Sequence, residues 1–170
     1  MGLFSRVREA VDARAPSPRP VPDVPIPEEG DSPQSLRRTM DDVIEFINRS
    51  AGRLPGVAVV HARRITDALR ETIDTSQVRP LDVYAVLAVK STLNDYLPTT
   101  LRSYLAVDTA LINTPRGSGR TPSQSLLEQL DDLQRSASAT LVAARDQDAD
   151  ALMTQGSFLR TKFSGSDLDL

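Results

Sequence analysis

The sequence of 170 residues predicts an all-α protein, a bundle of four to five helices preceded by a proline-rich N-terminal tether. Apolar residues recur at steps of three and four along most of the chain after the tether, which is the spacing of amphipathic helices. Proline directly follows a hydroxyl residue at Ser32-Pro33 and at Thr121-Pro122, the pattern of a capped helix start. Seven of the twelve prolines lie between Pro16 and Pro33, where neither regular helix nor central strand can form.

Residues 1–14 predict a short amphipathic docking helix. Its docking face is formed by Leu3, Phe4, Val7 and Val11, and the charged residues lie largely on the other side. A helix of this length is marginal in water, so we expect it to be ordered only when the docking face contacts a protein partner or a membrane surface. A frayed terminus without function is the alternative interpretation.

Residues 15–31 predict an extended proline-rich linker, because each proline fixes its own φ and biases the preceding residue away from helix. At about 3.1 Å per residue, this linker spans roughly 50 Å. The helical bundle is expected to occupy residues 32–163, and residues 164–170 are expected to form a disordered acidic tail.

Two helices are predicted in the first half of the bundle. The first begins at Ser32-Pro33 and ends at the break formed by Leu54, Pro55 and Gly56, after which the second begins. We interpret the charged residues of the second helix as a solvated face. The stripes expected to face inward are Leu36, Met40, Val43, Ile47 and Leu54 in the first helix, and Ala58, Ala62, Ile65, Leu69 and Ile73 in the second.

Residues 82–107 form the longest apolar-rich stretch and contain all three tyrosines. The apolar pattern continues too far for a typical strand, and no second candidate strand exists to pair with it, so a helix is predicted. Pro98 is expected to kink or restart this helix. The tyrosines are interpreted as core aromatics whose hydroxyls reach the edge of the domain. The residues assigned structural roles here are Tyr84, Tyr96, Leu97, Pro98 and Tyr104.

Two further helices are predicted after a polar loop. The first starts at Thr121-Pro122 and carries an apolar seam from Leu126 to Ala144, with the spacing of a bundle or a coiled coil, so homo-oligomerisation through this seam is one hypothesis. The second follows an acidic turn and places Gly156 on its inward stripe. A glycine inside a helix costs about 1 kcal/mol relative to alanine, so Gly156 predicts a close helix crossing.

Composition excludes several classes of protein. A formal net charge of −3 and scarce aromatic residues argue against a nucleic-acid binder, because affinity for a polyanion comes mainly from clustered cations. The absence of cysteine removes thiolate chemistry and cysteine-based metal sites, and the single histidine, His61, removes multi-histidine sites. No window is apolar enough to span a membrane and no secretory signal is present, so a cytoplasmic location is expected.

The residue pattern contains no constellation that predicts an active site, a cofactor site or a metal site. Asp146, Asp148 and Asp150 alternate like the start of a calcium loop, but Ala151 and Ser157 stand where that loop needs glycine and a bidentate glutamate. We therefore interpret the three aspartates as helix-capping acids. His61 is interpreted as a surface residue.

Three stretches resemble the XpaC-like family of bacterial proteins: DYLPTTLRSYL at 95–105, and SLLEQLDDLQ at 125–134 paired with DADALMTQGSFLRTKF at 148–163. The likeness covers roughly residues 84–163. Its distinctive residues are Tyr96-Leu97-Pro98 followed by Tyr104-Leu105, and Phe158-Leu159 before Lys162-Phe163. That family is labelled after hydrolysis of a chromogenic indolyl phosphate and is associated with toxic-anion (tellurite) resistance proteins.

The resemblance implies a helical protein that works beside a helical partner in envelope or toxic-anion stress. It supplies no catalytic residue, because the matching positions hold structural residue types. Some family members carry membrane helices ahead of this region, where this chain has only the segment from Leu3 to Val11. We therefore predict a non-enzymatic interaction or scaffold module, cytoplasmic or peripheral at the inner face of the membrane. The alternatives are a phosphatase-like hydrolase, as the family label suggests, and a homo-oligomeric structural protein.

Overall fold

The structure is a computed structural model that describes residues 31–117 and 119–163. The predicted docking helix with Leu3, Phe4, Val7 and Val11, the linker before Asp31 and the acidic tail at 164–170 lie outside the described residues. The described part of the chain confirms the all-α fold class, because its regular structure is helical and it contains no strand.

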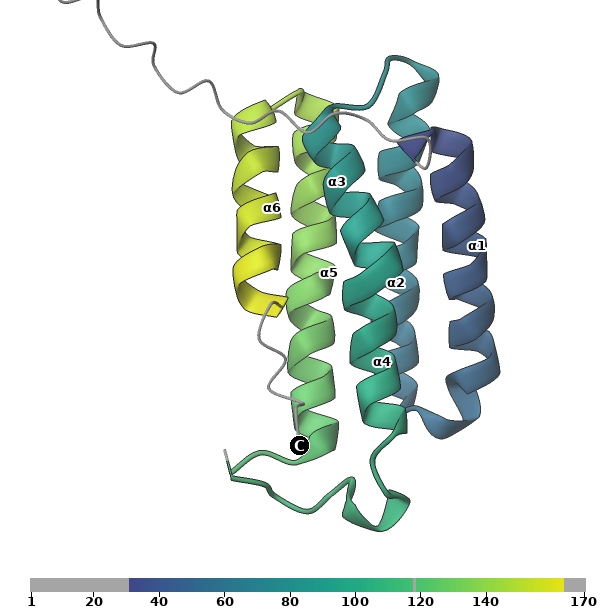
Figure 1. Ribbon diagram of the computed structural model, residues 1–170, viewed down its shortest axis with the longest axis vertical. Coiled ribbons are helices and arrows are strands. Elements are labelled where there is room, and N and C mark those ends of the chain that lie inside the picture. The colour runs from purple at the N-terminus through teal and green to yellow at the C-terminus, as the bar shows by residue number, and fades with distance from the viewer. Residues whose placement is uncertain (1–30, 118, 164–170) are drawn as a thin grey trace, which may run out of the picture.

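Within residues 31–117 and 119–163, six α-helices make up five helical rods, because α3 and α4 are joined end to end by a π-helical turn at Thr92–Tyr96 (Figure 1). The rods run roughly along one axis, and the start of α1, the α2–α3 loop and the α5–α6 turn lie at the same end of the bundle. The helices are α1 (Pro33–Ser50), α2 (Gly56–Asp74), α3 (Val83–Ser91), α4 (Leu97–Leu105), α5 (Pro122–Asp146) and α6 (Ala149–Phe163).

Both predicted helix starts are confirmed by side-chain caps. The Ser35 N–H donates to Ser32 Oγ at 3.1 Å, which satisfies one of the free backbone donors at the start of α1. Thr121 and Gln124 form a capping box at the start of α5, since each side chain accepts a hydrogen bond from the other residue's backbone N–H. Pro33 and Pro122 follow these caps at the first position of each helix. A backbone N–H at this position would make no hydrogen bond within the helix, so its absence in proline costs nothing.

The break predicted at Pro98 takes the form of a wider helical turn, and the rod continues through it. Pro98 has no N–H, and in a regular α-helix its ring would press against the carbonyl four residues earlier. The preceding π turn instead lets the Leu97 N–H bond to the Thr92 carbonyl, five residues back. Leu93, Leu97 and Leu101 are all buried, so the apolar face is continuous across the proline.

The core lies between α2 and α5, which share the most extensive helix contact of the bundle. The predicted stripes of the first two helices are buried, from Leu36 in α1 to Ile73 in α2. On α5, Leu126, Leu130 and Leu133 are also buried within the bundle. The seam considered for homo-oligomerisation is therefore occupied by the protein's own helices, and an oligomer would need a different surface.

The three tyrosines do not share one environment. Tyr104 is buried in the main core, and its hydroxyl lies 3.5 Å from Ser123 Oγ. Tyr96 is only half-buried and packs against that core from outside. Tyr84 is also half-buried and packs on a small second cluster that includes Ala85 and Leu152. The prediction of core aromatics is thus correct in full only for Tyr104.

Gly156 does not lie at a close helix crossing, which corrects the expectation from sequence. A Cβ atom placed on Gly156 would have no neighbouring atom within 4 Å. The inward stripe of α6 is narrow, with Leu152 and Leu159 buried and Gly156 only half-buried beside them. Helical spacing therefore located the correct side of α6 but did not show how near the next helix is.

Replacing Gly156 by alanine is expected to raise the free energy of unfolding by about 0.5–1 kcal/mol, because alanine restricts the unfolded chain and favours helix without a steric clash. Urea denaturation followed by circular dichroism measures this change. Ser157→Ala, at the exposed neighbouring position, is the matched control for a generic gain in helix propensity. A destabilised Gly156→Ala protein would contradict the open environment of this residue.

Candidate functional site

The acidic turn between α5 and α6 is a helix cap. Asp148 Oδ1 accepts a hydrogen bond from the Ala151 N–H at 2.9 Å, at the start of α6. Asp146 ends α5 and Asp150 lies in the first turn of α6. No group of three or more acidic or histidine side chains in the described ranges is placed to hold a metal ion. The capping interpretation is confirmed for Asp148.

His61 connects two helices and is not the surface residue expected from sequence. It is half-buried, and its Nδ1 lies 2.8 Å from Oε1 of Gln134 on α5. Farther along the same pair of helices, Arg145 donates to Glu71. These two contacts between α2 and α5 join residues more than 70 positions apart, so a scan along the chain could not pair them.

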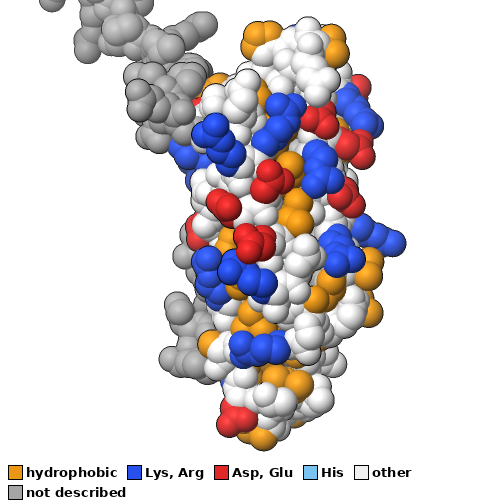
Figure 2. All heavy atoms as spheres, turned by 90° about the vertical axis from the view of Figure 1, so that its right-hand side faces the viewer, with side chains coloured by type: hydrophobic (Ala, Val, Ile, Leu, Met, Phe, Trp, Pro, Cys, Tyr) orange, Lys and Arg blue, Asp and Glu red, His pale blue; other side chains and the backbone are white. Residues whose placement is uncertain are grey.

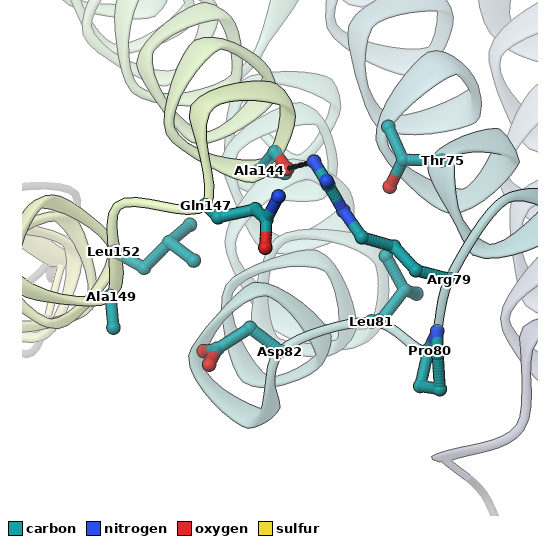
Figure 3. Close-up of a pocket in the computed structure, with 9 residues that line it drawn as sticks. All are labelled: Thr75, Arg79, Pro80, Leu81, Asp82, Ala144, Gln147, Ala149 and Leu152. Carbon is teal, nitrogen blue, oxygen red and sulfur yellow. Dashed lines mark hydrogen bonds between the residues drawn. The ribbon is translucent and has the colours of Figure 1, made fainter.

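A small cavity of about 240 Å³ lies at the end of the bundle where the α2–α3 loop meets the α5–α6 turn (Figure 3). Arg79 reaches from the loop to the end of α5, where its Nη2 donates to the carbonyl oxygens of Ala144 at 3.1 Å and Arg145 at 2.7 Å. The lining residues are Thr75, Arg79, Pro80, Leu81, Asp82, Ala144, Gln147, Ala149 and Leu152.

The charged groups of this cavity hold backbone ends in place. Arg79 satisfies carbonyls that have no helical partner and puts a positive charge at the negative end of the α5 dipole. Asp82 Oδ1 accepts from the Tyr84 N–H at 2.8 Å and so caps α3. The Thr75 hydroxyl donates a hydrogen bond to the Thr72 carbonyl oxygen at 2.7 Å, so this side chain is also engaged by the backbone at the edge of the cavity. The cavity is therefore a structural junction, which sequence analysis missed because a lone arginine in a loop carries no pattern.

A larger groove of about 530 Å³ adjoins this junction and shares three lining residues with it. We call it the end groove, and it is lined by Asp31, Pro33, Ser76, Gln77, Val78, Arg79, Pro80, Leu81, Val83 and Val86. Its lining is mainly apolar, and Val78 is 88% exposed, more than any other large apolar side chain of the described residues. The groove was missed from sequence because it combines two stretches of chain, 31–33 and 76–86, that lie more than 40 residues apart.

The side of the bundle around α1 shows no comparable apolar surface. Blue and red side chains alternate over it, with smaller apolar areas between them (Figure 2). A hollow of about 270 Å³ between α1 and α2 is lined by Ile44 and Ile47 and by polar groups that have partners within the bundle. Arg63 donates to Asn48 Oδ1 at 3.2 Å, and Arg70 lies 3.6 Å from Asp67. This arrangement is consistent with the predicted solvated face.

The stretches that carry the family resemblance pack against each other. The Tyr96 and Phe163 rings lie 5.3 Å apart between centroids, which joins the π turn to the end of α6. Nearby, Lys162 Nζ lies 2.8 Å from Asp132 on α5, and this carboxylate also pairs with Arg135. Tyr96, Lys162 and Phe163 therefore fasten α6 to the bundle, a structural role.

Burial raises the pKa of the Tyr96 phenol above 10.0; the nearby Asp95 carboxylate adds to this effect and Arg160 opposes it. Because the pKa is higher in the folded state, the stabilising contribution of Tyr96 is complete below pH 10.0 and is lost as pH rises through its folded-state pKa. The difference between phenolate absorbance titrations of the wild type and Tyr96→Phe isolates this group. A component titrating below pH 10.0 would contradict the effect of burial.

In the part of the chain that the structure describes, these surfaces define an all-α five-rod bundle with an apolar opening at the end groove. Among the described helices, none is both long and apolar enough to cross a bilayer. No protein-family model, curated protein or solved structure matches the chain. The resemblance to the XpaC-like family stays a prediction from the residues quoted above.

Proposed function

We propose that this protein is a non-enzymatic interaction or scaffold module, which docks on a protein partner through residues 1–14 and presents the helical bundle behind a proline-rich linker. One observation carries this proposal: the charged side chains around the cavities of the described bundle cap helices or pair with one another, as Arg79 and Asp82 do. The docking face of Leu3, Phe4, Val7 and Val11 is, in contrast, a predicted apolar stripe that precedes the proline-rich linker in the sequence.

The resemblance to the XpaC-like family supports a partner of the toxic-anion-resistance type, itself helical and acting in envelope or stress functions. A cytoplasmic protein held at the inner face of the membrane fits this proposal, with the partner or the docking face making the contact. The rival proposal, phosphatase-like hydrolysis, rests on the family label alone. Metal-dependent turnover of an aryl phosphate by the pure protein, abolished by Asp146→Asn, Asp148→Asn or Asp150→Asn, would overturn the non-enzymatic proposal.

The docking proposal is tested with two variants of the full chain. Phe4→Asp places a charge on the docking face, whereas Ser5→Asp places the same charge on the polar side of the same segment. Affinity purification from the native cell is expected to recover the partner with the wild type and Ser5→Asp, and to lose it with Phe4→Asp. Sedimentation with liposomes shows whether lipid is bound instead. Identical behaviour of the two variants in both assays would refute docking through this face.

A further inference from the structure

We propose that the end groove binds residues 1–14 of the same chain, so that the docking face is covered by the bundle until a partner displaces it. This inference rests on the proposed function, because the covered face is the one proposed to bind the partner. It assigns the end groove a specific occupant, so that the groove and the protein's partner compete for residues 1–14.

The end groove has the chemistry of a site for apolar side chains. Leu81 and Val86 are half-buried and belong to the outer layer of the main core, and Val78 extends this surface into solvent at 88% exposure. A volume of about 530 Å³ lies within the range of ligand pockets and accommodates a few side chains such as Leu3, Phe4 and Val7.

The charged side chains that line the groove already have partners, so we expect a ligand to be recognised through apolar contacts. Asp31 lies 2.9 Å from Lys90 Nζ, and Arg79 donates to the two carbonyls at the end of α5. An anionic or cationic ligand would have to compete with these partners. An amphipathic segment with an apolar stripe and a separate polar side has no such requirement, and residues 1–14 are such a segment.

The position of the linker favours the protein's own segment as the occupant. Asp31 and Pro33 line the groove, so residues 15–30 connect the docking segment directly to its rim. Residues 15–30 confine the docking segment to within about 50 Å of the rim, which corresponds to an effective concentration on the order of millimolar. A second copy of the chain at micromolar concentration is therefore at a disadvantage. The segment's availability to a partner falls in proportion to the fraction of molecules in the covered state.

The test uses the full chain with one spin label. Because the protein contains no cysteine, Ser5→Cys provides a single attachment site on the polar side of the segment. We expect loss of amide peak intensity at groove residues such as Gln77, Val78 and Val83, relative to a diamagnetic label. Phe4→Asp and Val78→Asp should each restore these intensities. Val57→Asp is the matched control, because Val57 is also an exposed valine, at 57%, but does not line the groove, and it should leave the loss unchanged.

Three outcomes would overturn the inference: no loss of intensity, a loss spread evenly over the bundle, or a loss that appears only between spin-labelled and isotope-labelled copies, which would show exchange between chains. The test separates this inference from the proposed function. If the groove peaks are unaffected while Phe4→Asp still loses the partner, only the self-docking inference fails. If the groove peaks are affected while Phe4→Asp retains the partner, the proposed function fails and self-docking stands.

Discussion

Leu130→Ala is expected to lower the free energy of unfolding by about 2–5 kcal/mol, the largest effect predicted for a single substitution in this protein. Leu130 is completely buried on α5, the helix that contacts α2, α3, α4 and α6. Removing its isobutyl group forfeits the transfer energy of that group and leaves a cavity that surrounding helices fill only in part. The loss is large because neighbours from several helices cannot all move inward together.

Urea denaturation monitored by circular dichroism gives the unfolding free energy of Leu130→Ala. Leu127→Ala is the matched control, since the same side chain is removed from the same helix at a half-buried position on the edge of the core. The control is expected to lose distinctly less stability than Leu130→Ala. Equal losses for the two variants would contradict the central place of Leu130 in the bundle.

Arg79→Ala is expected to lower the free energy of unfolding by about 1–3 kcal/mol, which is large for a residue in a loop. The substitution removes two hydrogen bonds to carbonyls at the end of α5 and the positive charge beside the negative end of that helix. It also disconnects the α2–α3 loop from the α5–α6 turn (Figure 3). Local opening of this end of the bundle should therefore accompany the loss.

Arg79→Lys provides the control, because lysine keeps the charge near the helix end but lacks the planar fork that reaches two carbonyls at once. It is expected to recover part of the lost stability. Amide hydrogen exchange in the last turn of α5 measures the local opening and should be fastest in Arg79→Ala. A change in stability within about 0.5 kcal/mol of wild type, the range of ordinary surface substitutions, would refute the capping role.

The features predicted correctly are local in the chain. The caps at Ser32 and Thr121 contact backbone groups three residues away, and the apolar stripes follow from the helical repeat alone. The break at Leu54 and Pro55 is likewise a property of adjacent residues. In each case, the residues that determine the structure are present within one window of sequence.

The features missed or predicted wrongly depend on distance between helices. Gly156 lies on the correct side of α6, but its open surroundings depend on how closely α6 approaches its neighbours. His61 finds its partner on α5, 73 positions later. The end groove combines the start of α1, the α2–α3 loop and the first turns of α3, none of which forms a recognisable site alone.

The sequence by itself determined the all-α class, the starts of α1 and α5 and the apolar stripes of α1 and α2, because helical periodicity and capping act over a few residues. Tertiary structure alone decided which helices are neighbours, which side chain caps the C-terminal end of α5 and where an apolar opening remains. Arg79 shows the physical reason: it is 65 and 66 positions from the carbonyls it binds, and only the packing of five rods brings them within hydrogen-bonding distance.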